Sequence, residues 1–297
     1  MERGAIPIAD LSGGLDLQAT LESGQSYCWR RDDGRAYEEP FATGGDAWYH
    51  TVVGGDVIRA RQLDGFLEWE STTDADPLVR ELLRLDDDLD AIVAGTPDDP
   101  LIDAAYDAFR GMRIVNDPAF PTMISFICSA QMRVERIHRM QIALAETFGE
   151  EINANGRTYQ AFPTPERLAA ASEGELRELG LGYRAPYVRE TARMIADGER
   201  HPTEARGLPY EEARDHLTEF VGVGPKVADC VLLFSLGHLE AVPLDTWIQT
   251  AIEEYYPDCA RGSYAATSRA IRERFGGEYA GYAQTYVFHY LRAGLDP

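Results

Sequence analysis

Residues 220–230, FVGVGPKVADC, place two glycines and a proline between two stretches of helical composition. Glycine permits the backbone conformations that close a tight turn, and proline is favoured in the first turn of a helix. We therefore expect a helix that ends at Phe220, a turn over Gly222 and Gly224, and a second helix that starts near Pro225. The exposed backbone amides of such a turn and helix start can bind phosphate without a charged side chain.

The same stretch holds the only lysine of the chain, Lys226, while the other basic residues are arginines. A solvated surface position is the ordinary interpretation of a lysine, but the uniqueness of this one and its place behind the turn indicate that a primary amine is needed there. A lysine that acts as a nucleophile must lose its proton from a reference pKa of about 10.4, and burial beside cationic arginines favours that loss.

A carboxylate partner for Lys226 is Asp245 in AVPLDTWIQTAI, 19 residues later. We expect Asp245 to cap the N-terminus of a helix, and a capping aspartate held at a cleft can also stabilise positive charge that develops on a sugar. Helical spacing places Lys226, Asp229 and Cys230 on one face, where they could line a cleft. Asp229 is a second candidate, although a solvated or paired position is the simpler interpretation.

A dinucleotide-binding fingerprint, G-x-G-x-x-G/A with an acid about 20 residues later, is a rival interpretation of the same stretch. Val227 occupies the third glycine position of that pattern. Residues 210–220 also have the composition of a helix, whereas the fingerprint needs a buried strand before its first glycine. The turn between two helices is therefore the preferred interpretation.

The chain changes character near Pro77. Residues 1–70 are rich in strand formers, and Gly54-Gly55 within AWYHTVVGGDVIRARQ predicts a β-hairpin. From Pro77 onward the pattern is helical and stays so, which predicts an α+β fold with a small N-terminal β domain and a mostly helical body. The predicted helical stretches, most of them ending near glycine, are 76–93, 99–112, 121–149, 165–180, 184–198 and 210–224.

The formal net charge of −22 argues at first against nucleic acid as a partner. An excess of acids with arginine in place of lysine is, however, what we expect of a salt-adapted proteome. The excess is also uneven: residues 64–104 carry 13 acids and 2 arginines, whereas residues 261–292 carry 5 arginines and 2 acids. The C-terminal region could therefore face an anion.

The four cysteines are scattered without a C-x-x-C pair, which argues against a zinc ribbon or a cysteine-ligated iron–sulfur cluster and predicts no metal site. Free thiols fit a reducing compartment. Because no apolar run is long enough to span a bilayer and no signal peptide is evident, we expect a cytoplasmic protein without a membrane partner.

Five motifs, taken in order, resemble those of one enzyme family. The chain resembles the helix–hairpin–helix (HhH-GPD) glycosylase superfamily and, more closely and over nearly its whole length, the eukaryotic-type 8-oxoguanine DNA glycosylase/AP lyases. The motifs are DLQATLESGQSYCWR, FICSAQMRVERIHRM, LRELGLGYRAPYV, GVGPKVADCVLLFSL with AVPLDTW, and YAGYAQTYVFHYL.

The resemblance implies a β domain over residues 1–85 and a two-lobed all-helical glycosylase body. One lobe, 86–120 with 241–297, would carry the base pocket, and the other, 121–240, would end in the helix–hairpin–helix. By the same resemblance the target base is flipped from the duplex. Lys226 then attacks the sugar C1′ and forms a Schiff base that β-eliminates, while Asp245 stabilises the oxocarbenium-like transition state.

The resemblance also implies a recognition set. The Gly24 carbonyl would accept a hydrogen bond from N7–H of 8-oxoguanine, whereas guanine would leave it unmet at a cost of about 1–3 kcal/mol. Phe288 and Cys230 would sandwich the base, and Gln284 would read its Watson–Crick edge. Residues implied to contact the DNA are Gln131, Arg136, Tyr183, Arg184, Gly222 and Gly224, with Tyr183 as a wedge and the two arginines holding the opposite cytosine.

The chain departs from the family pattern at two sites. Gln131, Met132 and Arg133 stand where the family has an asparagine run that fills the gap left by the base, and Trp247 stands where it has a histidine. The first departure concerns opposite-base fidelity, and the second concerns phosphate contact or closure of the active site.

The resemblance predicts a monomer that acts on double-stranded DNA containing 8-oxoguanine opposite cytosine, is associated with the nucleoid and needs no cofactor. The alternatives are a glycosylase for alkylated purines, which needs no lysine, and a non-catalytic helix–hairpin–helix DNA-binding protein. An endonuclease III-like enzyme usually carries a C-terminal four-cysteine cluster, which this chain lacks.

Overall fold

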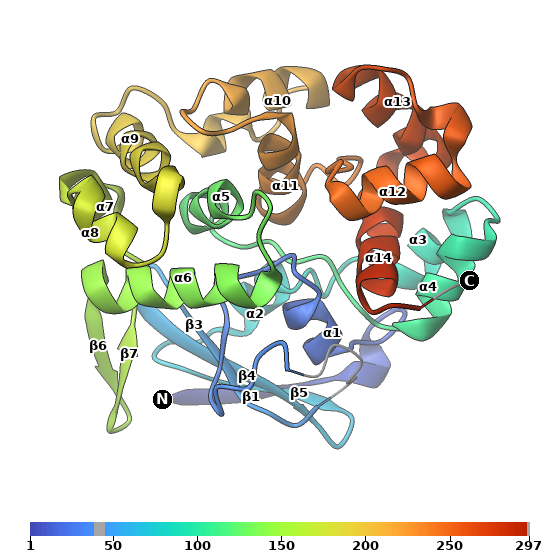
Figure 1. The fold of residues 1–297 in the computed structure, drawn as a ribbon. Coiled ribbons are helices and arrows are strands. Elements are labelled where there is room, and N and C mark those ends of the chain that lie inside the picture. The colour runs from blue at the N-terminus through green and yellow to red at the C-terminus, as the bar shows by residue number, and fades with distance from the viewer. Residues whose placement is uncertain (39–44, 296–297) are drawn as a thin grey trace.

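An antiparallel sheet forms the N-terminal part of the molecule, seen at the bottom of Figure 1. The computed structural model describes residues 1–38 and 45–295. Helices make up most of the chain after the sheet, so the predicted α+β class with a small β domain and a helical body is confirmed. The strands are paired in the order β1-β5-β4-β3-β2, with β1 Glu2–Pro7, β2 Arg30–Arg31, β3 Tyr49–Val53, β4 Asp56–Leu63 and β5 Phe66–Ser71.

The predicted hairpin at Gly54-Gly55 joins β3 to β4. Val53 pairs with Asp56, so the turn has two residues, and their φ angles of 61° and 92° are those that glycine adopts readily. Leu63 likewise pairs with Phe66 across a two-residue turn at the next hairpin. These two turns set the register that buries Ile58, Ala60, Leu67 and Trp69.

The helical body is built from helices shorter than several of the predicted stretches. Stretch 76–93 is divided at Arg84, which has a φ of 47°, and stretch 121–149 is divided near Gln131, which has a φ of 52°. The helices are α1 Leu17–Glu22, α2 Asp76–Leu82, α3 Leu89–Gly95, α4 Pro100–Ala108, α5 Ala119–Cys128, α6 Val134–Phe148, α7 Pro165–Ala170, α8 Glu173–Glu178, α9 Ala185–Ala196, α10 Tyr210–Thr218, α11 Pro225–Ser235, α12 Thr246–Tyr255, α13 Tyr264–Arg274 and α14 Ala280–Arg292.

Two groups of helices stand above the sheet in Figure 1. On one side α7, α8 and α9 pack together, and α5 packs against α6, α9 and α11. On the other side α14 packs against α4, α12 and α13. Helix α11 lies between the two groups in this view.

A second small sheet corrects the expectation that the chain stays helical after Pro77. Strands β6 (Glu151–Ala154) and β7 (Arg157–Gln160) form an antiparallel hairpin around Asn155 and Gly156. Both turn residues have positive φ angles, 51° and 74°. Asn-Gly between alternating residues is a strong hairpin signal, and the sequence carries it at this position.

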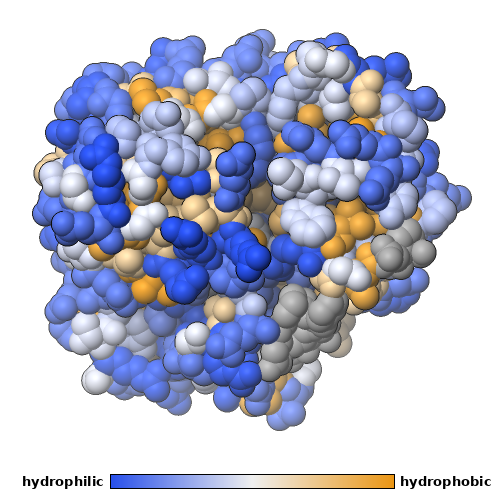
Figure 2. Space-filling view, in the orientation of Figure 1, coloured by the Kyte–Doolittle hydropathy of each residue, from blue (hydrophilic) through white to orange (hydrophobic). Residues whose placement is uncertain are grey.

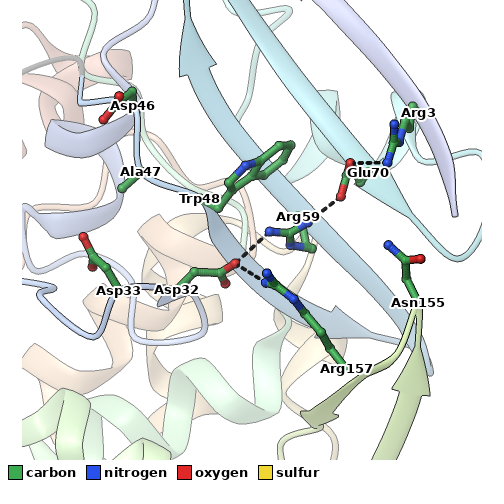
Figure 3. A pocket seen from close by; sticks show the side chains of 10 residues that line it. All are labelled: Arg3, Asp32, Asp33, Asp46, Ala47, Trp48, Arg59, Glu70, Asn155 and Arg157. Atoms are coloured by element: carbon green, nitrogen blue, oxygen red, sulfur yellow. Dashed lines mark hydrogen bonds and ion pairs between the residues drawn. The ribbon is translucent and has the colours of Figure 1, made fainter.

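Ion pairs connect the β6–β7 hairpin to the main sheet, as Figure 3 shows. The Arg157 guanidinium lies 2.9 Å from the Asp32 carboxylate, and Arg59 lies 2.7 Å from the same carboxylate. Arg59 also pairs with Glu70, which pairs with Arg3. One network of ion pairs thus connects Arg3 on edge strand β1, Asp32 directly after β2 on the other edge, and the β6–β7 hairpin.

Arg113 is a fully buried arginine whose partners are backbone carbonyls. Its Nε donates to Gly14 O at 2.9 Å, and its terminal nitrogens donate to the carbonyls of Ser12, Arg84 and Asp87 at 2.6, 2.8 and 3.2 Å. One guanidinium therefore joins the segment that follows β1, the segment between α2 and α3, and the segment that precedes α5.

Replacing Arg113 with methionine is expected to lower the free energy of unfolding by about 3 kcal/mol, because four partly buried carbonyls lose their donor at ~1 kcal/mol or more each. Urea unfolding followed by circular dichroism measures the change. Arg110→Met is the matched control, since the Arg110 side chain is 81% exposed and pairs with Asp107 three residues before it. A loss no larger than that of the control would contradict the role given to Arg113.

Candidate active site

The turn between α10 and α11 has the predicted form. Helix α10 ends at Thr218, two residues before the expected Phe220, and α11 begins at Pro225 as expected. Gly222 has a φ of +84°, and a Cβ there would lie 2.6 Å from Tyr187 Cβ, so both the backbone conformation and the packing require glycine.

Gly224 differs from Gly222. Its φ of −90° and ψ of 176° are accessible to any residue, and an added Cβ would meet no described atom within 4 Å. The turn itself therefore does not require glycine at this position, which is the N-cap residue of α11. Its small size leaves the backbone amides of the helix start open to an approaching group.

Lys226 is half-buried in the first turn of α11 and points toward α5. Its Nζ donates a hydrogen bond to Ser129 Oγ at 2.9 Å and lies 5.2 Å from the centre of the Phe126 ring. The positive charge of Lys226 also interacts with the thiol of Cys230, one helical turn later. The amine is thus held by Ser129 and Phe126, which come from a segment about one hundred residues earlier.

Asp245 caps the N-terminus of α12, as the sequence predicted. Its Oδ1 accepts a hydrogen bond from the Ile248 N–H at 2.8 Å. Burial raises the pKa of the Asp245 carboxyl, and the positive charge of Lys226 opposes that rise. The two candidate residues, 19 positions apart in the chain, therefore interact electrostatically in the fold.

Cys230 lies on the Lys226 side of α11, whereas Asp229 does not. The predicted cleft lined by an amine, a thiol and this second carboxylate is wrong for Asp229. Its side chain is fully buried and accepts hydrogen bonds from the hydroxyls of Tyr210 and Tyr264. Helical spacing could not show this, because it does not say which sides of a buried helix are covered by other elements.

The residues expected to form a base pocket come from three separate elements. An added Cβ on Gly24 would lie 3.3 Å from Phe288 Cε1 and 3.0 Å from Val134 Cγ1, so Gly24 and Phe288 are neighbours. Gln284 is 4% exposed on the same helix, α14, and its Oε1 accepts a hydrogen bond from Thr285. Cys230 is buried, and burial raises the pKa of its thiol to about 12.

The loop between α5 and α6 approaches several candidate DNA contacts. Ser129 in this loop bonds Lys226, and Ala130 O accepts a hydrogen bond from Arg184. The next residue, Gln131, is exposed and adopts the left-handed conformation, which is uncommon for a residue other than glycine, asparagine or aspartate. The Arg184 guanidinium lies 4.3 Å from the centre of the Tyr183 ring.

Tyr183 and Arg184 have opposite exposures although they are adjacent. Tyr183 is 59% exposed, whereas Arg184 is 5% exposed. Tyr183 also contacts Tyr187 edge to face, with 6.4 Å between the ring centres. Arg136 is exposed in the first half of α6. The fold therefore presents an aromatic ring and a guanidinium to solvent and keeps a second guanidinium inside.

Sequence reasoning missed three residues around the amine: Ser129, Phe126 and Tyr27. Tyr27, from the segment that precedes β2, has its ring 5.8 Å from that of Phe126, and its hydroxyl interacts electrostatically with Cys230 and Asp245. All three lie within the quoted motifs DLQATLESGQSYCWR and FICSAQMRVERIHRM, but the local pattern does not show their role, because their contacts with the residues of the candidate site are long-range. The N-terminal part of the chain thus reaches the candidate site.

The face of the molecule in Figure 2 is mostly hydrophilic, with hydrophobic residues gathered toward its middle, between the two groups of helices. Trp247 follows Asp245 by two residues and is 42% exposed.

Within residues 1–38 and 45–295 there is no cluster of histidine, cysteine and acidic residues that could hold a metal ion. In the same ranges no helix has the length and apolarity to cross a membrane.

A lysine amine beside a carboxylate, behind a glycine turn, is an arrangement suited to attack on an electrophilic sugar carbon. Residues 124–276 match the family described as HhH-GPD superfamily base excision DNA repair protein. Residues 8–123 match 8-oxoguanine DNA glycosylase, N-terminal domain. The chain belongs to the HhH-GPD superfamily of base excision DNA repair proteins.

Named relatives extend this likeness. The chain is 32% identical to the N-glycosylase/DNA lyase of Saccharomyces cerevisiae over 92% of its own length and 82% of the yeast protein. It is 36% identical to the probable N-glycosylase/DNA lyase of Methanothermobacter thermautotrophicus, over 67% of this chain and 69% of that protein.

A solved structure is also similar over most of both chains. The Clostridium acetobutylicum 8-oxoguanine glycosylase/lyase, in complex with double-stranded DNA containing cytosine opposite 8-oxoguanine, has a TM-score of 0.82 and 28% identity. The match covers 94% of this chain and 92% of the Clostridium chain.

Gly24→Ala is expected to destabilise the protein by about 1–3 kcal/mol, because the left-handed backbone and the contacts with Val134 and Phe288 both oppose a methyl group. Gly34→Ala is the control: Gly34 also has a positive φ, 74°, but an added Cβ there would meet no described atom within 4 Å. Thermal unfolding of both variants separates backbone strain from crowding. Equal losses of stability in the two variants would mean that the side of Gly24 that faces Val134 and Phe288 has room for a methyl group.

Proposed function

We propose that this protein is a bifunctional DNA glycosylase/AP lyase that excises 8-oxoguanine from duplex DNA and cleaves the strand by β-elimination. The proposal is carried by one observation: the only lysine of the chain lies behind the glycine turn of an HhH-GPD protein, in electrostatic contact with Asp245. The named relatives, which are N-glycosylase/DNA lyases, support it.

Lys226 is the proposed nucleophile. Its neutral amine attacks C1′ of the flipped nucleotide, a C1′–N bond forms, and the bond from C1′ to N9 of the base breaks with its electron pair leaving on the base. Opening of the sugar ring then gives an imine between Nζ and C1′. Loss of a proton from C2′ expels the 3′ phosphate and cleaves the strand, and water releases the lysine.

Asp245 is proposed to act on charge rather than as a nucleophile. The N9–C1′ bond weakens before the amine bond is complete, so positive charge develops on the sugar, and a fixed carboxylate stabilises it. The capping bond from Ile248 fixes one oxygen of Asp245 at 2.8 Å, so the carboxylate is oriented before the substrate arrives. Orientation in advance is what makes such a charge effective.

The base pocket is proposed to consist of Gly24, Cys230, Gln284 and Phe288. The proximity of Gly24 to Phe288 supports this, because it brings the turn after α1 next to an aromatic ring of α14. Cys230 stays a thiol at neutral pH, since burial raises its pKa to about 12, so it offers the base a polarisable surface without charge.

Tyr183, Gln131, Arg136 and Arg184 are proposed to hold the DNA where the base has left the stack, with the amides at Gly222 and Gly224 on a phosphate. The Tyr183 ring is exposed, as a wedge must be. Arg184 links this ring to the loop that holds Gln131, because its guanidinium lies over the Tyr183 ring and donates to the carbonyl of Ala130, the residue before Gln131. To contact a base, Arg184 must exchange its bond to Ala130 for a new acceptor.

We propose that the helical body consists of the two predicted lobes. The packing of α4, α12 and α13 on α14 supports a base-pocket lobe made of 86–120 and 241–297. The packing of α5 with α6, α9 and α11 supports a lobe over 121–240. We further propose that the protein acts as a monomer, with 8-oxoguanine opposite cytosine as its preferred duplex and the nucleoid as its site of action.

The experiment that tests the function is incubation of the protein with duplexes that each carry one lesion: 8-oxoguanine, an alkylated purine or an abasic site. Excision and strand cleavage at 8-oxoguanine support the proposal. Excision confined to alkylated purines without strand cleavage would favour an alkylpurine glycosylase, and binding without any excision would favour a non-catalytic protein.

Lys226 is expected to form a covalent imine with DNA that sodium borohydride reduces to a stable adduct. Denaturing electrophoresis of the mixture with an 8-oxoguanine duplex should show the adduct for the unmutated protein and lose it for Lys226→Gln. Lys226→Arg is the charge-matched control and should also give none. An undiminished adduct in both variants would mean that the N-terminal amine, and not Lys226, forms the imine.

Asp245→Asn is expected to slow base excision by about 10²-fold or more while the Kd for lesion DNA changes by less than about threefold, because the charge acts chiefly on the transition state. Single-turnover kinetics and fluorescence anisotropy measure the two quantities. Asp258→Asn, an exposed aspartate beyond α12, controls for the loss of one negative charge. Parallel losses of binding and rate would reduce Asp245 to a structural cap.

Excision of 8-oxoguanine is expected to be faster opposite cytosine than opposite adenine. Cytosine offers O2 and N3 as adjacent acceptors to two guanidiniums, whereas adenine presents an amino donor on that edge. The preference should be looser than in the family, because Gln131 fills the gap with one more methylene than asparagine. Single-turnover rates on both duplexes give the ratio.

Arg184→Ala should narrow that ratio by slowing excision opposite cytosine. Arg177→Ala is the control, because Arg177 is an exposed arginine of α8 paired with Glu173. Equal rates on the two duplexes for the unmutated protein would make the arginines general phosphate contacts.

A further inference from the structure

Asp229 is a fully buried carboxylate at the junction of α10, α11 and α13. The Tyr210 hydroxyl donates to its Oδ1 at 2.8 Å, and the Tyr264 hydroxyl donates to its Oδ2 at 2.7 Å. Tyr210 is the first residue of α10, and Tyr264 is the first residue of α13. Both carboxylate oxygens are thus fixed by helix starts on either side of α11.

Positive side chains surround this carboxylate without bonding it directly. Arg214 Nη1 donates to the Tyr210 hydroxyl at 3.2 Å, and the Arg272 guanidinium lies 4.0 Å from the centre of the Tyr210 ring. Burial raises the pKa of Asp229 to about 6, and the two arginines oppose that rise. Asp229 is therefore mostly ionised at neutral pH and above, where it is a strong acceptor for both tyrosines.

The Tyr264 hydroxyl has a second bond that Tyr210 does not share. It accepts a hydrogen bond from the Leu244 N–H at 3.2 Å. Leu244 directly precedes Asp245, and Asp229 follows Lys226 by three residues, which is one turn of α11. Two hydrogen bonds therefore connect the backbone beside the proposed electrostatic catalyst to the helix that carries the proposed nucleophile.

We propose that Asp229 and Tyr264 are positioning residues that set the placement of Asp245 relative to Lys226. The inference rests on the proposed function of those two residues. At the start of α12, Thr246, Trp247 and Gln249 are exposed, whereas Leu244 and Ile248 are buried, so only one face of this end is packed. The bond from Leu244 to Tyr264 supplies a fixed point there, and a shift of about 1 Å between reacting groups can cost on the order of 10²-fold in rate.

The test compares Tyr264→Phe with Tyr210→Phe. Each change removes one hydroxyl and one bond to Asp229 and keeps the ring, but only Tyr264→Phe also removes the acceptor of the Leu244 N–H. Three quantities are measured: the stability to urea, the Kd for a duplex with an 8-oxoguanine nucleotide fluorinated at C2′ to resist excision, and the single-turnover excision rate on the normal lesion.

Tyr264→Phe is expected to lower the excision rate by roughly 10- to 100-fold at an unchanged Kd. Tyr210→Phe should change the rate by less than about threefold although it costs at least as much stability, because it also removes the acceptor of Arg214 and the contact with Ser268. Equal rates for the two variants, or a Tyr264→Phe rate that falls only in proportion to the unfolded fraction, would overturn the proposal.

Asp229→Asn provides an independent arm if Tyr264→Phe does not fold. The amide keeps the volume and one acceptor oxygen but loses the charge, so the Tyr264 link is weakened. Excision should slow more than in Tyr210→Phe, again at an unchanged Kd, and a rate equal to that of Tyr210→Phe would overturn the proposal. If the unmutated protein excises no 8-oxoguanine, the proposed function fails instead, and the two failures are distinguishable.

Discussion

The buried guanidinium of Arg113 ties the N-terminal part of the chain to the helical body through four hydrogen bonds to backbone carbonyls. It binds carbonyls of two segments that are far apart in the sequence and joins them to its own, and an unpaired buried charge would be too costly to retain. The same segment holds the Gln25 amide, which donates to Arg113 O at 2.8 Å and accepts from the Val115 N–H at 2.9 Å. Gln25 follows Gly24 directly. The hydrogen bonds of Gln25 to the segment around Arg113 therefore also fix the backbone of the proposed base pocket.

Local patterns in the sequence predicted the parts of the fold that local chemistry decides. Gly54-Gly55 predicted its hairpin because two consecutive positive φ angles need residues that tolerate them, and Pro225 predicted a helix start because its ring presets φ. The pairing of Lys226 with Asp245 was also accessible, since each stands at the N-terminal end of one of two consecutive helices. Asn155-Gly156 is the same kind of hairpin signal, but it was missed because the helical pattern on both sides of it predicted a continuous helical region.

Other features could not be read from the sequence because they depend on which faces meet. Ser129 and Phe126 contact Lys226 only because α5 packs on α11, and helical spacing does not choose a partner helix. Asp229 shares a helical stretch with Lys226 and Cys230, yet α10 and α13 cover its side. The exposure of Tyr183 and the burial of Arg184 were likewise unpredictable, since adjacent residues of one turn differ only through the surface on which the turn lies.

The internal position of Arg184 has a consequence for how the protein encounters undamaged DNA. With 5% of its surface exposed and its guanidinium bonded to Ala130, this arginine adds little to the attraction for an intact duplex. In the role proposed for it, Arg184 gives up its bond to Ala130 when an acceptor in a disrupted stack compensates for that loss. Under this proposal, affinity for ordinary DNA and response to a disrupted site depend on different residues.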